Sequence, residues 1–123
     1  MTENSQEPSE LIDRVSLLER VEGDQELLTE MIHLFQEDAP NLLTAMRDAL
    51  QRSDMAVLER SAHSLKGAAS NLSAKATAAA ALQLEKDAKN KDAEAAKKSL
   101  AEVERAVEHL LPALAELCHG VTK

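Results

Sequence analysis

The sequence predicts an all-α protein, an up-down antiparallel four-helix bundle with a short additional N-terminal helix. Apolar residues recur at spacings of three and four along most of the chain, which is the pattern of one face of an α-helix. The chain of 123 residues is 44% hydrophobic, mostly Leu and Ala, and contains one aromatic residue, so a helical core is favoured over a sheet. Short connections between the predicted helices indicate antiparallel neighbours.

The chain divides into a flexible N-terminal tail at residues 1–10, a helical bundle at 11–119 and a C-terminal tail at 120–123. The first of these segments is polar and contains Pro8. It lacks the apolar core of an export signal, and the chain has no run of about 18 apolar residues that would cross a membrane. We therefore expect no membrane insertion and a cytoplasmic location.

Two helices are predicted in the first half of the chain. Apolar residues that mark a short first helix are Leu11, Ile12, Val15 and Leu18. Gly23 ends this helix and Asp24 is the expected N-cap of the next one. The second helix has a wide apolar stripe: Leu27, Leu28, Met31, Ile32, Phe35, Leu42, Leu43, Met46 and Leu50. Because Pro40 interrupts this stripe, the pattern predicts either one helix kinked near 38–40 or two helices that meet there.

The next helix begins after Ser53 and Asp54, which are expected to cap it, and runs to about Leu72. At about 100° per residue, its core stripe is formed by one set of residues: Leu58, Ala62, Leu65, Ala69 and Leu72. A second face of the same helix carries four residues of a different kind: His63, Lys66, Gly67 and Ser70. The histidine is therefore expected to point away from the core.

Two further helices complete the predicted bundle. After a tight turn at residues 73–74, an Ala-rich helix runs to Ala88 and ends at 90–91. Asp92 begins the last helix, whose apolar residues are again three and four apart: Ala96, Leu100, Val103, Val107, Leu110, Leu114 and Leu117. Pro112 is expected to kink it.

The face that carries His63 has the composition of a phosphoryl-accepting site. A neutral imidazole is a competent nucleophile near neutral pH, and Lys66 could offset the charge of a phosphoryl group. Gly67 lies in a helix interior, where Gly lowers helix stability by roughly 0.5–1 kcal/mol relative to Ala. Its presence there indicates that another group needs to approach the helix closely at this position. A solvated histidine beside a lysine is the simpler alternative on these residues alone.

The segment 63–72, His-Ser-Leu-Lys-Gly-Ala-Ala-Ser-Asn-Leu, resembles the H-x-L-K-G-[SA]-[SA]-x-x-[LI] signature of histidine-containing phosphotransfer (HPt) domains of bacterial phosphorelays. Residues 35–40, Phe-Gln-Glu-Asp-Ala-Pro, resemble a second stretch of that family. The resemblance extends from about Leu11 to Leu117. Two positions depart from it, Ser70 and Ser73, where family members often carry Gly.

The resemblance implies that His63 accepts a phosphoryl group from a receiver-domain aspartyl phosphate and relays it to another receiver aspartate. Lys66 would stabilise the phosphoryl charge, and Gly67 would give steric access. Ser70, Glu85 and Lys89 would lie near the phosphoryl group or the partner. Glu85 and Lys89 are four residues apart, so an ordinary surface ion pair explains them equally well.

The implied partners are receiver domains of response regulators, with a hybrid sensor kinase as a further candidate, and the chain is expected to be a monomer. Three glycines cannot supply a G-x-G-x-x-G or Walker-type loop, so the chain is expected to be no enzyme with its own ATP site. No cofactor or metal is expected on this chain, since Mg²⁺ would be bound by the partner receiver. The net charge of −8 disfavours nucleic-acid binding.

Two alternatives to phosphotransfer belong to other classes of protein. A helical module that docks receiver domains without carrying phosphate would not need a nucleophile at residue 63. A di-iron bundle would need its two Glu-x-x-His pairs, 30/33 and 116/119, to face the core, but both pairs fall off the apolar stripes. Cys118 is interpreted as a small apolar filler and His109 as an ordinary surface residue.

Overall fold

The structure, a computed structural model, describes residues 12–121. This part of the chain forms five helices and no strand, which confirms the all-α class. The helices are α2 (Arg14–Val21), α3 (Gln25–Gln51), α4 (Met55–Asn71), α5 (Lys75–Lys89) and α6 (Ala93–Val121). The predicted tail at 1–10, Leu11 and residues 122–123 lie outside the described residues. α6 continues past residue 119, the predicted end of the bundle.

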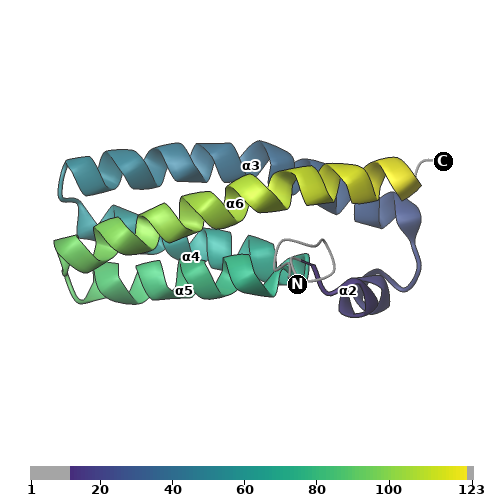
Figure 1. Ribbon diagram of the computed structural model, residues 1–123, viewed down its shortest axis with the longest axis horizontal. Coiled ribbons are helices and arrows are strands. Elements are labelled where there is room, and N and C mark those ends of the chain that lie inside the picture. The colour runs from purple at the N-terminus through teal and green to yellow at the C-terminus, as the bar shows by residue number, and fades with distance from the viewer. Residues whose placement is uncertain (1–11, 122–123) are drawn as a thin grey trace, which may run out of the picture.

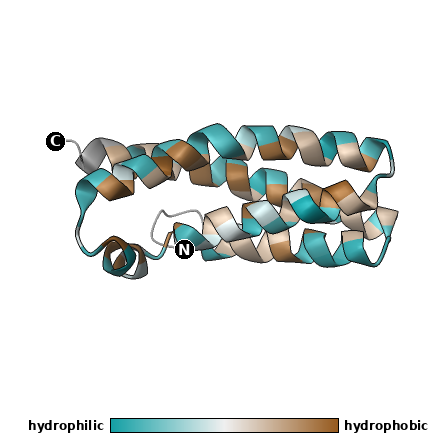
Figure 2. Ribbon diagram, turned by 180° about the vertical axis from the view of Figure 1, so that it is seen from behind, coloured by the Kyte–Doolittle hydropathy of each residue, from teal (hydrophilic) through white to brown (hydrophobic). Residues whose placement is uncertain are grey.

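The four long helices lie side by side around one shared core (Figure 1). α4 packs against α3 and α5, and α6 packs against the same two helices, so α3–α6 and α4–α5 form opposite sides of the molecule. α2 lies across the end of the bundle where α3 begins (Figure 1). Apolar residues recur along each long helix and on α2 (Figure 2). The predicted α4 stripe is entirely buried in this core.

Aspartate side chains begin most of the helices by the same device. Asp13, Asp24 and Asp54 each accept a hydrogen bond from a backbone N–H three residues later, at 3.0–3.2 Å. Asp92 does the same for the first turn of α6 at 3.1 Å. Each cap satisfies a donor that the helix itself leaves free, a gain of about 1 kcal/mol. The predicted caps at 24 and 54 are therefore confirmed.

α3 is one continuous helix that contains Pro40, so the two-helix alternative is wrong. Proline removes one backbone donor from a helix, which costs about 3 kcal/mol in an isolated helix. Buried residues on both sides of the proline, Phe35 and Leu43 among them, hold the two halves to the same core. α6 likewise contains Pro112 without ending there.

The exposed face of α2 differs from the sequence interpretation. Val15 and Leu18, two of the residues that mark the first helix, have exposed fractions of 68% and 51%. Leu17 and Val21, one turn apart, are the residues of α2 that enter the core. Because α2 meets only the end of the bundle, one narrow stripe suffices to attach it. Leu34 of α3, 59% exposed, adds a further apolar side chain at the surface.

α2 is also tied to the turn between α4 and α5. The backbone N–H of Asp13 donates to the carbonyl of Ser73 at 2.9 Å, and its carboxylate pairs with Lys75 at 3.1 Å. The Ser73 hydroxyl donates to the Ser16 hydroxyl at 3.1 Å. Ser73 has a φ of +55°, in the left-handed region that Gly adopts most readily. In this chain the serine side chain contributes a contact in return.

Candidate functional site

The site is built on the solvent face of α4. His63 lies on the side of α4 away from its buried stripe, and its side chain is 66% exposed. Lys66 and Gly67 follow one turn later, as the α-helical repeat requires. The predicted separation of a core face from a histidine face is therefore correct.

A carboxylate from α5 joins the two polar side chains of this face. Nδ1 of His63 lies 3.0 Å from Oε2 of Glu85, within hydrogen-bond distance. Nζ of Lys66 lies 3.0 Å from Oε1 of the same carboxylate and forms an ion pair with it. Glu85 thus bridges His63 and Lys66, and we call this arrangement the Glu85 bridge. The Glu85 side chain is only 19% exposed, so the bridge is shielded from water on the side that faces the bundle.

The hairpin of α4 and α5 brings these residues together. His63 lies eleven residues before Ala74 and Glu85 lies eleven residues after it. Since the turn at Ala74 reverses the chain, residues at equal distances from it lie opposite one another. The buried residues of the hairpin include several alanines, which let the two helix axes approach closely: Ala62, Ala69, Ala74, Ala81 and Ala88.

The charges of this cluster favour an ionised Glu85. The Lys66 ammonium is the main cause that holds the pKa of the Glu85 carboxyl below its ordinary value, and the hydrogen bond with His63 acts in the same direction. Partial burial opposes them by disfavouring the charged form. An ionised carboxylate can only accept, so Nδ1 of His63 carries the proton. The lone pair of the neutral ring is then on Nε2.

Gly67 leaves open space beside the imidazole. A Cβ atom built at this position would meet no other atom within 4 Å, and the residue is exposed. Internal packing of the bundle therefore does not require the glycine. Its absence of a side chain clears the surface next to His63, as the sequence analysis expects for close approach of a partner.

A family model described as Hpt domain matches residues 30–117. The matched segment is most of the chain and contains the whole His63 face. The chain belongs to the Hpt domain family. A search of curated proteins and a search of solved structures each gave no match. Hpt domains are phosphotransfer modules of phosphorelays that interact with receiver domains, and they are not kinases.

The remaining residues that the resemblance singles out in this Hpt domain do not join the bridge. Ser70 and Lys89 are exposed, and the ion pairs of the described residues connect Glu85 to Lys66 and not to Lys89. The surface pair considered from the i,i+4 spacing of Glu85 and Lys89 is therefore wrong. The ion pair of Glu85 with Lys66 of the neighbouring helix is favoured over a pair with Lys89 because Lys66 is partly buried, with 29% of its side chain exposed.

An apolar hollow lies between α3 and α4 of the Hpt domain, on the side of α4 away from α5. It is formed by residues of α3 and of the last turns of α4: Met31, Leu34, Phe35, Asp38, Ala68, Asn71 and Leu72. Ala68, which lines the hollow, directly follows Gly67 in α4. The hollow and the imidazole therefore lie on either side of the exposed surface at Gly67. Leu34 brings an exposed apolar side chain to its edge.

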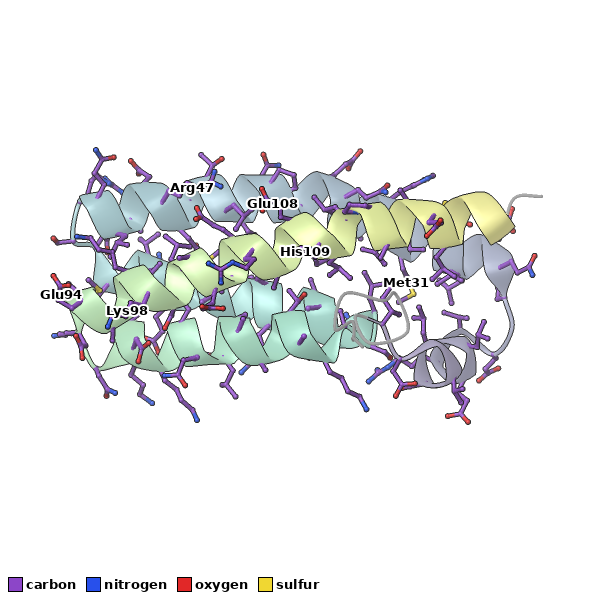
Figure 3. All side chains as sticks on the ribbon, viewed as in Figure 1. Met31, Arg47, Glu94, Lys98, Glu108 and His109 are labelled. Carbon is purple, nitrogen blue, oxygen red and sulfur yellow. The ribbon has the colours of Figure 1, made fainter. Side chains whose placement is uncertain are left out.

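A separate groove runs between α3 and α6, on the side of the Hpt domain opposite the α4–α5 pair. Arg47 of α3 forms an ion pair with Glu104 of α6 there. Figure 3 labels Arg47 and Glu108, which line this groove from the two helices.

The described side chains of the two Glu-x-x-His pairs lie on the surface of the bundle. Glu30, His33 and Glu116 are exposed, as the sequence predicts, while the side chain of His119 lies outside the described residues. No group of three or more His, Cys, Asp or Glu side chains within the described ranges is arranged to hold a metal ion. Cys118 is buried, with Nε2 of His33 at 3.6 Å from its sulfur, a contact that the sequence pattern did not indicate. Of the helices described, none is long and apolar enough to span a membrane.

Proposed function

We propose that this chain is a phosphorelay intermediate in which His63 accepts a phosphoryl group from a receiver-domain aspartyl phosphate and passes it to the aspartate of another receiver. The observation that carries the proposal is the Glu85 bridge. It fixes one ring nitrogen of an otherwise exposed histidine and leaves the other, Nε2, free to react.

The proposed chemistry needs few groups from this chain. The Nε2 lone pair attacks phosphorus, and the bond between phosphorus and the donor carboxylate breaks with its electron pair going to that carboxylate. Phosphoryl transfer depends mostly on positioning and charge neutralisation. Lys66 lies at i+3 from His63, so its ammonium could move from Glu85 towards the phosphoryl oxygens. Ser70 and Lys89, both exposed on neighbouring turns, would contact the partner or the phosphoryl group.

The receiver would supply what this chain lacks. The reacting aspartate and the Mg²⁺ ion would both come from the receiver, and this chain would bind no cofactor. The exposed side chains of Val15, Leu18 and Leu34, with the hollow between α3 and α4, offer an apolar surface towards the α2 end of the bundle on which a receiver could dock. Burial of such side chains contributes about 25 cal/mol per Å² of apolar area.

Several finer features complete the proposal. The four long helices follow the up-down order of an antiparallel bundle, and the cyclic order of their contacts supports this. The bundle would occupy residues 11–119 of a monomer. A hybrid sensor kinase is proposed as a partner alongside the response regulators, and the relay role is the reason to expect a cytoplasmic location.

Labelled phosphate tests the proposal directly. The chain is incubated with a receiver carrying ³²P on its aspartate, separated, and exposed to acid and to alkali. We expect label on this chain that is lost in acid and retained in alkali, as for a phosphoramidate bond, and no label on a His63→Gln variant. Binding of the receiver without any transfer of label would instead support the docking-module alternative.

A further inference from the structure

We infer that a basic surface on one side of His63 fixes the orientation in which a receiver docks, by contacting carboxylates that flank the reacting aspartate of the receiver. The inference rests on the proposed function and names the surface chemistry of the partner. The basic surface is formed by four cationic side chains of α4, of α5 and of the turn after α5: Arg60, Lys86, Lys89 and Lys91. All four are exposed.

Helix geometry places these side chains beside the acceptor histidine. Arg60 lies three residues before His63, so both are on the same side of α4. Glu85 of α5 contacts His63, and Lys89 lies one turn beyond Glu85 on the same face of α5. Lys86 follows Glu85 directly. α4 begins and α5 ends at the end of the bundle that holds the α3–α4 and α5–α6 turns (Figure 1), so the basic surface extends from His63 towards that end.

The rest of the bundle does not neutralise the basic surface. None of the ion pairs within residues 12–121 includes one of its four side chains. Two neighbouring carboxylates are used inside the fold: Asp87 accepts hydrogen bonds from Gln83 and Ser99, and Asp92 caps α6. Glu59, partly buried, is the one acidic residue of α4. Such a concentration of positive charge, in a chain of net charge −8, indicates an acidic partner.

Helix stability explains only part of this surface. Lys86 and Lys89 lie in the last turn of α5, where the helix dipole favours a cation. Arg60 lies in the first half of α4, where the dipole gives a cation no advantage. Lys91 lies beyond the end of α5. A second reason is therefore needed for the cations on α4 and in the turn.

The proposed receiver has the complementary charge at its reacting centre. It would supply the aspartate and the Mg²⁺ ion, and Mg²⁺ is bound in proteins through carboxylates and other oxygen ligands. Carboxylates beside the reacting aspartate would therefore meet the basic surface when that aspartate faces His63. Complementary charges of this kind speed association and fix the register of the two partners.

The opposite end of the bundle disfavours the reversed orientation. Exposed acidic side chains gather on α2 and at the start of α3: Glu19, Glu22, Asp24, Glu26 and Glu30. A receiver rotated by half a turn about His63 would bring its carboxylates towards this acidic end, where like charges repel. The apolar surface at the α2 end and the basic surface on the other side of His63 thus favour the same orientation.

The test measures transfer of label from a receiver domain carrying ³²P on its aspartate to the intact chain, over a range of salt concentrations. Charge is reversed on each helix in turn, in Arg60→Glu and in Lys86→Glu. We expect each variant to lower the second-order rate constant of transfer about tenfold at about 0.01 M salt. The loss should be less than about twofold at about 1 M, since the Debye length falls from about 30 Å to about 3 Å. Wild-type rate constants in both variants at low salt would overturn the inference.

Lys98→Glu is the matched control, because it makes the same change in net charge at an exposed position of α6. Lys98 lies on the side of the bundle that Figure 3 shows, with Arg47 and Glu108. The rate constant of this variant should stay within about twofold of wild type at low salt. A loss as large as that of Lys86→Glu would mean that net charge alone governs transfer, and the inference would be wrong.

Potassium phosphoramidate separates recognition of the receiver from chemistry at the imidazole, because this small donor has no receiver surface. We expect Arg60→Glu and Lys86→Glu to accept a phosphoryl group from it at the wild-type rate. If their rates fall as much with phosphoramidate as with the receiver, the two residues act on His63 itself and the inference fails.

Binding of the unphosphorylated receiver, measured in the same variants, separates the inference from the proposed function. If the receiver binds the wild type but never labels His63, the phosphorelay role fails, while weaker binding by the two charge reversals supports the inference. If the receiver labels His63 and the reversals match wild type, the inference alone fails. Binding of a DNA duplex that the reversals abolish, with receiver binding unchanged, would assign the basic surface to nucleic acid and overturn the inference.

Discussion

Lys66 of α4 and Glu85 of α5 form an ion pair across two helices, with 3.0 Å between Nζ and Oε1. From the sequence alone, the expected partner of Lys66 is a phosphoryl group on His63. The observed pair means that the lysine is already oriented on the reacting face. It also means that Lys66 contributes to the contact between α4 and α5.

Substitution of Lys66 by Ala is expected to slow phosphoryl acceptance and to shorten the lifetime of the phosphohistidine, because the phosphoryl charge loses a cation within reach. The free energy of unfolding should also fall by less than about 1 kcal/mol, since the pair is partly exposed. Transfer kinetics and urea denaturation measure the two effects. Equal transfer rates and phosphohistidine half-lives in wild type and Lys66→Ala would remove Lys66 from the site.

Lys66→Arg serves as the charge-preserving comparison. We expect it to recover part of the transfer rate, because a planar guanidinium keeps the charge but not the geometry of an ammonium. The difference in transfer rate between wild type and Lys66→Ala should shrink as the salt concentration is raised, since salt screens the attraction between the Lys66 ammonium and the phosphoryl group. An advantage that is independent of salt would contradict a role based on charge.

Substitution of His63 by Gln is expected to abolish phosphoryl acceptance and leave the fold intact. The His63 side chain is largely exposed, and substitutions at such positions usually change stability by less than about 0.5 kcal/mol. Circular dichroism and the thermal midpoint check the fold, and labelled phosphate checks acceptance. A variant that unfolds, or that still forms phosphohistidine, would show that His63 is not the acceptor.

Gly67 allows steric access to be separated from helix stability. Gly67→Ala should be as stable as wild type or more stable by roughly 0.5–1 kcal/mol, because nothing lies within 4 Å of the added Cβ and Ala is the better helix former. Gly67→Gln should also fold, but its side chain should crowd the approach to the imidazole and slow transfer from a receiver. Wild-type transfer by Gly67→Gln would mean that close approach does not need the glycine.

Acidification should weaken the fold through Glu85 and Asp13. The Lys66 ammonium lowers the pKa of Glu85 from 4.5, and a backbone hydrogen bond from Ser16 is the main cause that lowers the pKa of Asp13 from 3.8. A carboxyl whose pKa is lower in the folded state adds stability above its unfolded pKa and loses it as pH falls through the folded pKa. The free energy of unfolding should therefore decline below about pH 4.5.

The contribution of Glu85 is isolated by comparing wild type with Glu85→Gln in urea at several pH values. The difference in unfolding free energy should be largest above pH 4.5 and should shrink as pH falls through the lowered pKa of Glu85 in the folded state. A difference that does not change over this range would show that charge at Glu85 has no part in stability.

The exposed apolar residues of α2 and α3 should matter for receiver binding and not for folding. Leu18→Ser and Leu34→Ser are expected to weaken receiver binding several-fold while the thermal midpoint stays near that of wild type, because both side chains are mostly exposed. His109→Ala, an exposed position on α6 (Figure 3), is the control and should bind normally. Normal binding by both leucine variants would place the docking surface elsewhere.

Periodicity predicted the long helices and the His63 face well because both depend on local repeats. The α4 stripe is buried as expected, and the aspartate caps at 24 and 54 are where the sequence puts them. Which face of α2 packs against the bundle was harder to predict from the sequence. A helix of eight residues offers more than one apolar stripe, and only the packing against the bundle selects Leu17 and Val21 over Val15 and Leu18.

The partner of Glu85 depended on contact between helices, which an i,i+4 rule within one helix does not describe. Counting outward from the turn at Ala74 would have placed Glu85 opposite His63. Which lysine forms the ion pair with Glu85 is decided by burial. Lys66 lies partly within the α4–α5 interface, whereas Lys89 is exposed to water, which weakens an ion pair.

The contacts of Asp13 and Ser16 with the α4–α5 turn give the exposed leucine on α2 a fixed distance from the imidazole. A receiver that docked on α2, as proposed, would therefore meet the histidine at a high effective concentration, as two linked reactants do. Loosening this attachment would leave each surface chemically unchanged, yet it would lower the fraction of encounters that end in transfer. In the proposed relay, the positional accuracy of phosphoryl transfer would thus depend partly on a turn that carries no reacting group.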